Sequence, residues 1–431
     1  MINFENMKEY VKFKLKNGTK IIFAPMKNTE TVTTLLLLPF GSRFEKDEDA
    51  GIAHFIEHML FKGTKNRPTP LSISKELDAL GAQYNAFTAY ESTGYFIRIL
   101  KENLKNALDI LSDIFFNSLF VEEEIEREKS VIFEEIKLYE DNPSLQIFQV
   151  FYQTIFGNHP LGRNIAGTFE SVKSITREKI ISFYKNFYQP NNLLITLAGA
   201  ITKKDLSLVE KYFAQKGKGK KRKFEKFFPS PHPPKIKIVN RSEIEQVQLM
   251  LGFPGISYFS PYEEALDILS IALGGNMSSR LFQEIREKRG LAYSVGCGNL
   301  SFNETGVFNI NAGIDVKNVE KVLEIIIEEL NKIKKDGLTK KEIVQTKEYL
   351  IRRIKIVLED SWMVANWYAD QEIVGKKILT PQEKFKKINK VKGDEIKKIG
   401  QKIFDKNQIN LALVGPVKEE EKYLKILKKL I

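Results

Sequence analysis

Hydrophobic and polar positions follow two different periods along the chain. Short apolar runs with partial alternation, at residues 31–40, 93–100 and 246–253, predict β-strands. Apolar residues recur every three or four positions in segments 103–117, 121–141, 318–335 and 340–359, which predicts amphipathic helices. Because neighbouring strands can pair antiparallel, we predict an α+β fold in which helices cover one face of each mainly antiparallel sheet.

The pattern of elements occurs twice. Residues 120–141 align without a gap with residues 338–359, so that Ile125 matches Ile343. Residues 174–201 align in the same way with residues 390–417, and both segments consist of an amphipathic stretch, a turn and an apolar strand that ends in glycine. The repeat predicts two homologous domains in tandem, at residues 1–215 and 235–431.

A basic segment lies between the two copies. Residues 216–234 begin with the run KGKGKKRK and end in a proline-rich stretch, which is typical of a solvated linker. The formal net charge of +12 could attract nucleic acid, but the lysines are dispersed along the predicted helices. We therefore expect no nucleic-acid partner.

The cysteine content and the apolar runs indicate a compartment. Cys297 is the single cysteine, so no intramolecular disulfide can form, and this fits a reducing environment. The first 18 residues lack the apolar core of a signal peptide, and the longest apolar run, Leu35–Leu38, is far too short to span a bilayer. We predict a cytoplasmic protein without a membrane partner.

The stretch AHFIEHML, residues 53–60, carries the clearest chemical signal. It holds two of the four histidines, His54 and His58, which on a helix would lie on one face about 6 Å apart. Both could bind one zinc ion, and Glu57 between them could act as general base, because zinc lowers the pKa of a coordinated water to about 7. Two histidines at this spacing could also be polar residues on a partly buried helix.

A catalytic zinc site needs a third protein ligand, and the acidic helix at 121–141 offers candidates. Glu128 and Glu135 lie two turns apart at the border of its apolar stripe, whereas Glu134 points away and should be solvated. The helical phase therefore allows either Glu128 or Glu135. The stripe consists of Ile125, Ile132, Ile136 and Tyr139.

The second copy lacks these side chains. Thr346 stands where the first copy has Glu128, Arg353 stands where it has Glu135, and no histidine follows His232. Both copies can keep the fold, but only the first keeps the potential metal ligands. This asymmetry favours a functional role over packing.

Taken together, five motifs resemble the pitrilysin family, which includes insulin-degrading enzyme and the mitochondrial processing peptidases. The HxxEH order of residues 54–58 is that of the inverzincins. The likeness extends from about residue 10 to residue 417. The motifs are GIAHFIEHMLFKGT (51–64), GAQYNAFTAYES (81–92), EREKSVIFEEI (126–136), HPLGRNIAGT (159–168) and SSRLFQEIREKRGLAYSV (278–295).

This resemblance implies roles for the residues already singled out. His54 and His58 match the zinc-binding histidines, Glu57 matches the general base and Glu135 falls at the position of the third ligand. Glu128 matches a glutamate outside the ligand set that supports catalysis. One zinc ion per chain is expected, although manganese or cobalt also suits nitrogen and oxygen ligands.

Further residues are singled out by the resemblance alone. Asn85 and Ala86 match an edge strand that binds extended substrate by β-augmentation. Without the family, Asn85 would be interpreted as a turn residue. Arg286 and Tyr293 match a pair that contacts substrate near the scissile bond; by themselves they are a surface charge and a strand aromatic.

The implied activity is that of a zinc-dependent endopeptidase acting on peptides or unfolded segments inside a clam-shell chamber. Longer relatives close such a chamber with four units, so a chain of two units would need a partner. We expect a homodimer, or a heterodimer with a related chain, in which Arg286 and Tyr293 serve the zinc site of the other subunit. The alternatives are a processing peptidase that makes one cut in a precursor, and a non-catalytic scaffold subunit.

Overall fold

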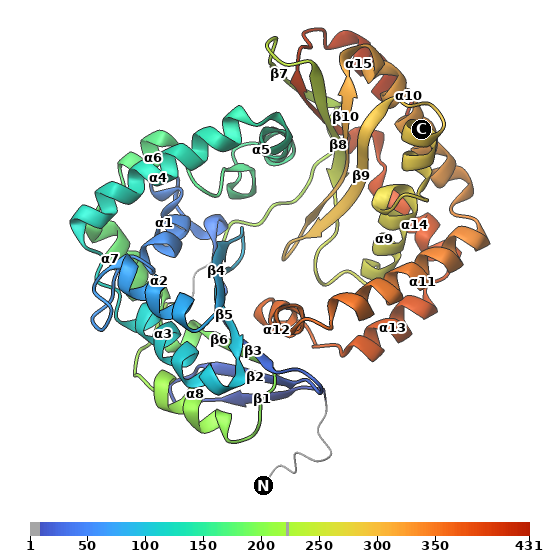
Figure 1. Ribbon diagram of the computed structural model, residues 1–431. Coiled ribbons are helices and arrows are strands. Elements are labelled where there is room, and N and C mark those ends of the chain that lie inside the picture. Colours follow the sequence, from blue (N-terminus) through green and yellow to red (C-terminus); the bar gives the residue numbers. More distant parts are fainter. Residues whose placement is uncertain (1–8, 221–223) are drawn as a thin grey trace. The chain divides into compact units, whose positions relative to one another are not determined.

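The computed structural model describes residues 9–220 and 224–431 (Figure 1). Residues 1–8 of the predicted first domain and 221–223 of the predicted linker lie outside the described residues. The chain forms two compact units. The first contains the residues up to Ile136, Asn164–Glu225 and Lys355–Thr380; the second contains Lys137–Arg163, Lys226–Ile354 and Pro381–Ile431. Each unit therefore includes a segment from the other half of the sequence.

The first unit contains a six-stranded sheet in the order β1-β2-β6-β3-β5-β4. Neighbouring strands pair antiparallel, except for the parallel pair of β2 and β6. The strands are β1 (Val11–Lys14), β2 (Lys20–Pro25), β3 (Thr31–Leu38), β4 (Gln83–Thr88), β5 (Thr93–Leu100) and β6 (Leu194–Gly199).

Helices cover both faces of this sheet. The core on one face includes Phe55, Leu108 and Ile97, and the core on the other includes Leu35 and Tyr368. The α-helices are α1 (Ile52–Met59), α2 (Pro70–Ala79), α3 (Leu104–Phe116), α4 (Glu122–Asp141, which runs past Ile136 into the second unit), α6 (Phe169–Lys173), α7 (Arg177–Phe187), α8 (Asp205–Phe213) and α12 (Ser361–Ile373). Short 3₁₀ helices are η2 (Ser42–Phe44), η3 (Asp47–Asp49), η4 (Lys101–Asn103) and η6 (Pro190–Asn192).

The register of the edge strand decides which side chains share a face. Among the described strands β4 pairs only with β5, and Asn85 lies opposite Phe96 while Ala86 lies opposite Tyr95. Ala86 and Tyr95 pack into the core that includes α1. Phe87 and Phe96 pack on the opposite face against α12. Asn85 therefore belongs to a strand rather than to a turn.

The second unit contains a five-stranded sheet in the order β7-β11-β8-β10-β9, with a parallel pair of β7 and β11. The strands are β7 (Lys235–Asn240), β8 (Gln246–Pro254), β9 (Ala292–Ser301), β10 (Gly306–Asp315) and β11 (Asn410–Gly415). The helices are α5 (Pro143–Phe156), α9 (Glu263–Ser270), α10 (Val319–Asp336), α11 (Lys340–Val357), α13 (Pro381–Lys390), α14 (Gly393–Ile403) and α15 (Glu421–Leu427). The second unit also contains the π-helices η7 (Ile271–Gly275) and η8 (Phe282–Glu287). Its 3₁₀ helices are η5 (Pro160–Gly162), η9 (Val316–Asn318) and η10 (Lys406–Gln408).

The predicted α+β class and the tandem repeat are confirmed. α7 followed by β6 in the first unit corresponds to α14 followed by β11 in the second, and both strands end in a glycine with positive φ, Gly199 and Gly415. We expected helices on one face of each sheet, but both faces are covered. α12 lies against β3 and β6, and α5 lies against β8 and β11, so each sheet carries on its second face a helix from the other half of the chain. Within the described residues, no helix combines the length and apolar character needed to cross a membrane.

Candidate metal centre

A glycine and a glutamate fix the start of α1, the helix that carries His54 and His58. Gly51 precedes α1 with a φ of 92°, and a Cβ atom there would lie 2.6 Å from the carbonyl oxygen of Ala166, so a larger residue would not fit. The Glu45 carboxylate accepts hydrogen bonds from the backbone N–H groups of Gly51 and Ala53, both at 2.8 Å. A negative charge at this end also complements the helix dipole.

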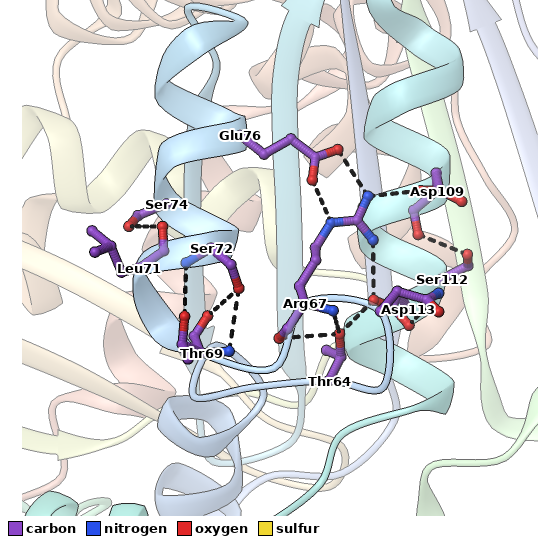
Figure 2. A network of polar contacts seen from close by, with 11 residues as sticks. Thr64, Arg67, Thr69, Leu71, Ser72, Ser74, Glu76, Asp109, Ser112 and Asp113 are labelled. Carbon is purple, nitrogen blue, oxygen red and sulfur yellow. Dashed lines mark hydrogen bonds and ion pairs between the residues drawn. The ribbon is translucent and has the colours of Figure 1, made fainter.

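An arginine fixes the chain just beyond the end of α1 (Figure 2). The buried Arg67 side chain donates hydrogen bonds to Glu76 on α2 and to Asp109 and Asp113 on α3. Thr64, which begins the same turn, donates to Asp113 as well. The turn after α1 is thereby tied to two other helices.

Three potential ligand atoms converge between α1 and α4. The Nε2 atom of His54 lies 3.6 Å from Oε2 of Glu135, and the Nε2 atom of His58 lies 3.7 Å from the same oxygen. One ligand atom from each residue falls within 4.8 Å of the others. The structure thus brings together the three residues that the sequence suggested as ligands.

Glu128 binds the far side of one histidine. Its Oε1 accepts a hydrogen bond from Nδ1 of His58 at 2.8 Å, and its Oε2 pairs with the Lys62 ammonium at 2.6 Å. A proton held on Nδ1 leaves the lone pair of Nε2 directed toward Glu135. Of the two glutamates that the helical phase allowed, Glu135 therefore faces both Nε2 atoms, and Glu128 supports the ring from behind.

Burial and neighbouring charges shift the pKa values of these groups. Burial, aided by His58, lowers the pKa of His54 to about 3, so its imidazole is neutral. Burial alone would lower the pKa of His58, but the hydrogen bond and charge of Glu128 raise it. Burial alone would raise the pKa of Glu128, but the hydrogen bonds from His58 and Lys62 lower it.

Glu57 lies on α1, the helix that also carries His54 and His58. Its Oε2 atom is buried and has no hydrogen-bond partner among the described residues. Burial raises the pKa of the Glu57 carboxyl, and Glu135 adds to this, whereas the neighbouring Thr88 side chain on β4 and the charge of His58 oppose it.

The donor set fits a divalent transition metal. Two imidazole nitrogens and one carboxylate oxygen form a common three-ligand set for catalytic zinc. The Nδ1–H of His58 leaves its Nε2 lone pair free for a metal, and the neutral His54 ring has one nitrogen lone pair to offer. The pairwise distances of 3.6 and 3.7 Å suit ligands about one ion. Burial, aided by Glu128, raises the pKa of Glu135, which a positive ion in the centre would reverse.

The acidic helix agrees with its predicted phase, except at one end. Glu134 is exposed, and Ile125, Ile132 and Ile136 are buried. Tyr139 was expected on the same apolar stripe, and this was wrong: its side chain is 41% exposed, and the buried side of α4 ends at Ile136. In the second unit Thr346 is buried like its counterpart Glu128, whereas Arg353 is exposed and its counterpart Glu135 is half-buried.

Of the remaining singled-out residues, Asn85, Ala86 and Tyr293 lie on edge strands and Arg286 lies on η8. Asn85 is exposed and Ala86 is half-buried on β4. In the second unit, the Arg286 guanidinium at η8 lies 5.3 Å from the ring centroid of Tyr293 on β9. The Tyr293 side chain is 79% exposed, so the pair is open to solvent within its unit.

Sequence reasoning missed two contributors to the centre. Lys62 pairs with Glu128, and its spacing of one helical turn after His58 was the available signal. Thr88 adjoins Glu57, and only the pairing of β4 with the rest of the sheet brings it there.

Two homologous α+β units, one with a two-histidine, one-glutamate donor cluster, define a duplicated protein with a candidate mononuclear metal centre. Residues 20–169 match the family model described as insulinase (peptidase family M16), and residues 174–350 match the peptidase M16 inactive domain. The chain belongs to the M16, or pitrilysin, peptidase family, which confirms the resemblance seen in the motifs.

Individual relatives agree with this assignment. The "Uncharacterized zinc protease YmxG" of Bacillus subtilis is 34% identical over 94% of this chain and 98% of its own length. An "Uncharacterized zinc protease" of Rickettsia felis is 36% identical over 94% of this chain and 97% of its own length. A crystal structure of a protease from Helicobacter pylori, 24% identical, shares the fold with a TM-score of 0.88 over 94% of this chain and 99% of that one.

Proposed function

We propose that this protein is a zinc-dependent endopeptidase that hydrolyses peptides or unfolded polypeptide segments. The observation that carries the proposal is the convergence of the His54 and His58 Nε2 atoms on the Glu135 carboxylate, with Glu57 on the same helix. The names of the relatives, which are zinc proteases, support the choice of metal and of reaction class.

His54, His58 and Glu135 would hold one zinc ion, which when bound polarises a peptide carbonyl and acidifies water. Glu57 takes a proton from the attacking water and later delivers it to the amine that leaves. The buried, uncommitted Oε2 of Glu57 and its raised pKa suit both transfers, because a carboxylate with a raised pKa holds the proton long enough to pass it on. Glu128 holds His58 in the orientation that this requires.

The substrate backbone would add to the free edge of β4 at Asn85 and Ala86. This places an extended peptide beside α1, because Ala86 and Tyr84 pack on the face that carries this helix. Arg286 and Tyr293 would steady the negative charge that develops on the substrate carbonyl.

We further propose that the protein acts as a dimer, of two copies or of this chain with a related one, that encloses the substrate in a chamber. The Arg286 and Tyr293 side chains of one subunit would then serve the metal centre of the other, and their open position in the second unit suits this role. We expect specific activity to fall as the protein is diluted below its dissociation constant. Full activity in a sample that sedimentation shows to be monomeric would contradict this.

A cytoplasmic location is proposed on the single cysteine, which gives no disulfide and fits a reducing compartment. Neither nucleic acid nor a membrane is part of the proposed function.

The decisive experiment is cleavage of quenched-fluorescence peptides by the wild type and by Glu57→Gln. This substitution keeps the ligands and the size of the side chain but removes the base, so we expect kcat to fall by about 100-fold or more at unchanged zinc content. Equal activity in the two proteins would assign the cleavage to another base or to a contaminant. Counting the sites cut in a mixed peptide digest separates broad degradation from a single processing cut.

A further inference from the structure

A pocket of about 480 Å³ opens beside the edge strand of the first unit, outside the metal cluster. β4 and β5 contribute side chains from one side, and the start of α12 contributes them from the other. The residues that shape it include Gln83, Asn85, Phe96, Arg98, Asp360 and Trp362.

The strand register places Gln83, Asn85, Phe96 and Arg98, but not the lining residues Ala82 and Tyr84, on the face of the sheet opposite α1. Phe96 packs in the core that contains α12, whereas Tyr95 and Ile97, its neighbours on β5, pack in the core that contains α1. Gln83 and Asn85 lie opposite Arg98 and Phe96 in the β4–β5 ladder. The pocket therefore adjoins the same edge strand as the candidate metal centre, but from the other face.

Two of the residues that line the pocket, Phe96 and Trp362, are aromatic and stack on each other. The rings of Phe96 and Trp362 are stacked, with centroids 4.0 Å apart and an interplanar angle of 27°, and Phe87 meets Trp362 edge-on at 6.2 Å. A further flat ring could continue this cluster in the offset or edge-on geometries that aromatic side chains prefer.

The wall of the pocket carries two charges that neutralise each other. The Arg98 Nη1 atom donates to Oδ2 of Asp360 at 2.6 Å. The other oxygen of Asp360 accepts from the backbone N–H groups of Trp362 and Met363 at the start of α12. Because Arg98 and Asp360 balance each other's charge, the pocket has little net attraction for either a basic or an acidic side chain. The planar guanidinium of Arg98 can instead lie against the π-face of a ring.

The free edge of β4 leads directly to this pocket. A peptide that adds to the strand places every second side chain on the pocket's face. The pocket adjoins Gln83 and Asn85, and Glu57 adjoins Thr88 further along the same strand. At about 3.3 Å per residue, the side chain over the pocket belongs roughly three to five residues from the bond that is cut.

We propose that this pocket binds an aromatic side chain of the substrate and thereby sets where the chain is cut. The proposal rests on the proposed peptidase function for its reference to a cut, but not for the binding itself. Phe96 and Trp362 supply the stacking surface, and Arg98, held by Asp360, supplies a cationic edge.

The test uses labelled peptides of a uniform Gly/Ser/Ala sequence that contain one Phe, or Ala, Glu or Lys at the same position. Binding is measured by fluorescence anisotropy to the full-length, zinc-loaded Glu57→Gln protein, which needs no turnover. We expect the Phe peptide to bind about tenfold more tightly than the Ala peptide. In the wild type, we expect the cut to keep a fixed distance from the Phe as the Phe is moved along the peptide.

Two further substitutions, each combined with Glu57→Gln, abolish the pocket: one removes an aromatic side chain and the other fills the space. Trp362→Leu removes an aromatic lining residue, and Gln83→Trp fills the pocket from an exposed position of β4. Both should bring the ratio of the Ala and Phe dissociation constants close to one. Met363→Leu, on the same helix but outside the pocket lining, should leave the ratio unchanged and is the matched control.

The outcomes separate this proposal from the proposed function. Wild-type cleavage without a preference for Phe in binding or in cut position would overturn the pocket and leave the peptidase standing. Tighter binding of the Glu or Lys peptide than of the Phe peptide would also overturn it, as would a Phe preference that survives both variants. A Phe preference in binding that depends on the pocket, without cleavage in the wild type, would support the pocket and count against the peptidase.

Discussion

At the scale of single residues, His58 has the most partners in the candidate centre. It contacts Glu128 through Nδ1 and faces Glu135 through Nε2, so one ring connects the support and the ligand sides. The orientation of this ring depends on a carboxylate that is itself buried and paired with Lys62. Loss of Glu128 should therefore act on metal affinity through His58, without removing a ligand.

We predict that Glu128→Ala weakens zinc binding about 10- to 100-fold, because His58 loses the acceptor that fixes its tautomer and orientation. Competition against a chromophoric chelator measures the affinity. Glu128→Gln keeps an acceptor oxygen and should lose less.

Glu126→Ala provides the control for this prediction, because Glu126 is exposed on the same helix and pairs only with Lys129 among the interactions described. It should leave zinc affinity unchanged. An equal loss in Glu126→Ala and Glu128→Ala would show a general charge effect and contradict the role assigned to the His58 contact.

The residues of the centre were predictable to the extent that they share an element. The i,i+4 spacing of His54 and His58 and the phase of Glu128, Glu134 and Glu135 follow from helix geometry alone. The choice between Glu128 and Glu135 required either the family or the structure, because the phase of one helix does not say which of its turns meets α1.

At the scale of elements, α1 cannot hold its position by itself. Eight residues are too few for a stable isolated helix in water, so its ends must be fixed by neighbours. Glu45 fixes the start, and Arg67 fixes the turn beyond the end (Figure 2). The centre therefore depends on residues that touch none of its ligands.

We predict that Arg67→Met destabilises the fold by about 3 kcal/mol, because Asp113, which is buried, loses its charged partner. Chemical denaturation followed by circular dichroism measures the change in the free energy of unfolding.

Lys65→Met, at an exposed position of the same turn, is the control and should change stability by less than about 0.5 kcal/mol. If Arg67→Met were as stable as this control, the network would not be what anchors the turn.

The packing of α12 against the sheet of the first unit could not be predicted from the sequence. The segment SWMVANWYADQEI has apolar residues on most sides, so its periodicity does not single out a buried face. Its partners on the sheet, such as Ile22 and Leu194, are far away in the chain. The run Leu35–Leu38 hinted that both faces of β3 are covered, but it could not say by which helix.

At the scale of the whole molecule, the linker is not the main connection between the two halves of the sequence, because each compact unit contains a segment from both halves. The first unit includes Lys355–Thr380, and the second includes Lys137–Arg163, so covalent halves and compact units differ. Contacts of α12 with β3 and β6, and of α5 with β8 and β11, connect the halves at two independent places.

We predict that a cut in the linker does not separate the halves. A protease site placed between Phe228 and Ser230, where the side chains are exposed, would give two fragments that still co-elute on size exclusion and unfold in one step with the intact protein's midpoint within a few degrees. Fragments that separate without denaturant would contradict the interchange of segments.

The exchanged helix also has a consequence for how the protein is made. The sheet of the first unit keeps an apolar face, including Ile22, Leu35 and Leu194, open until α12 emerges from the ribosome. At 5–20 residues per second, the interval between residues 225 and 380 lasts roughly 8–30 s, during which that face is exposed to other chains. Such a nascent chain avoids aggregation only if a chaperone binds this face or if its aggregation is slow. A ribosome stalled between these residues would hold a sheet with one apolar face exposed.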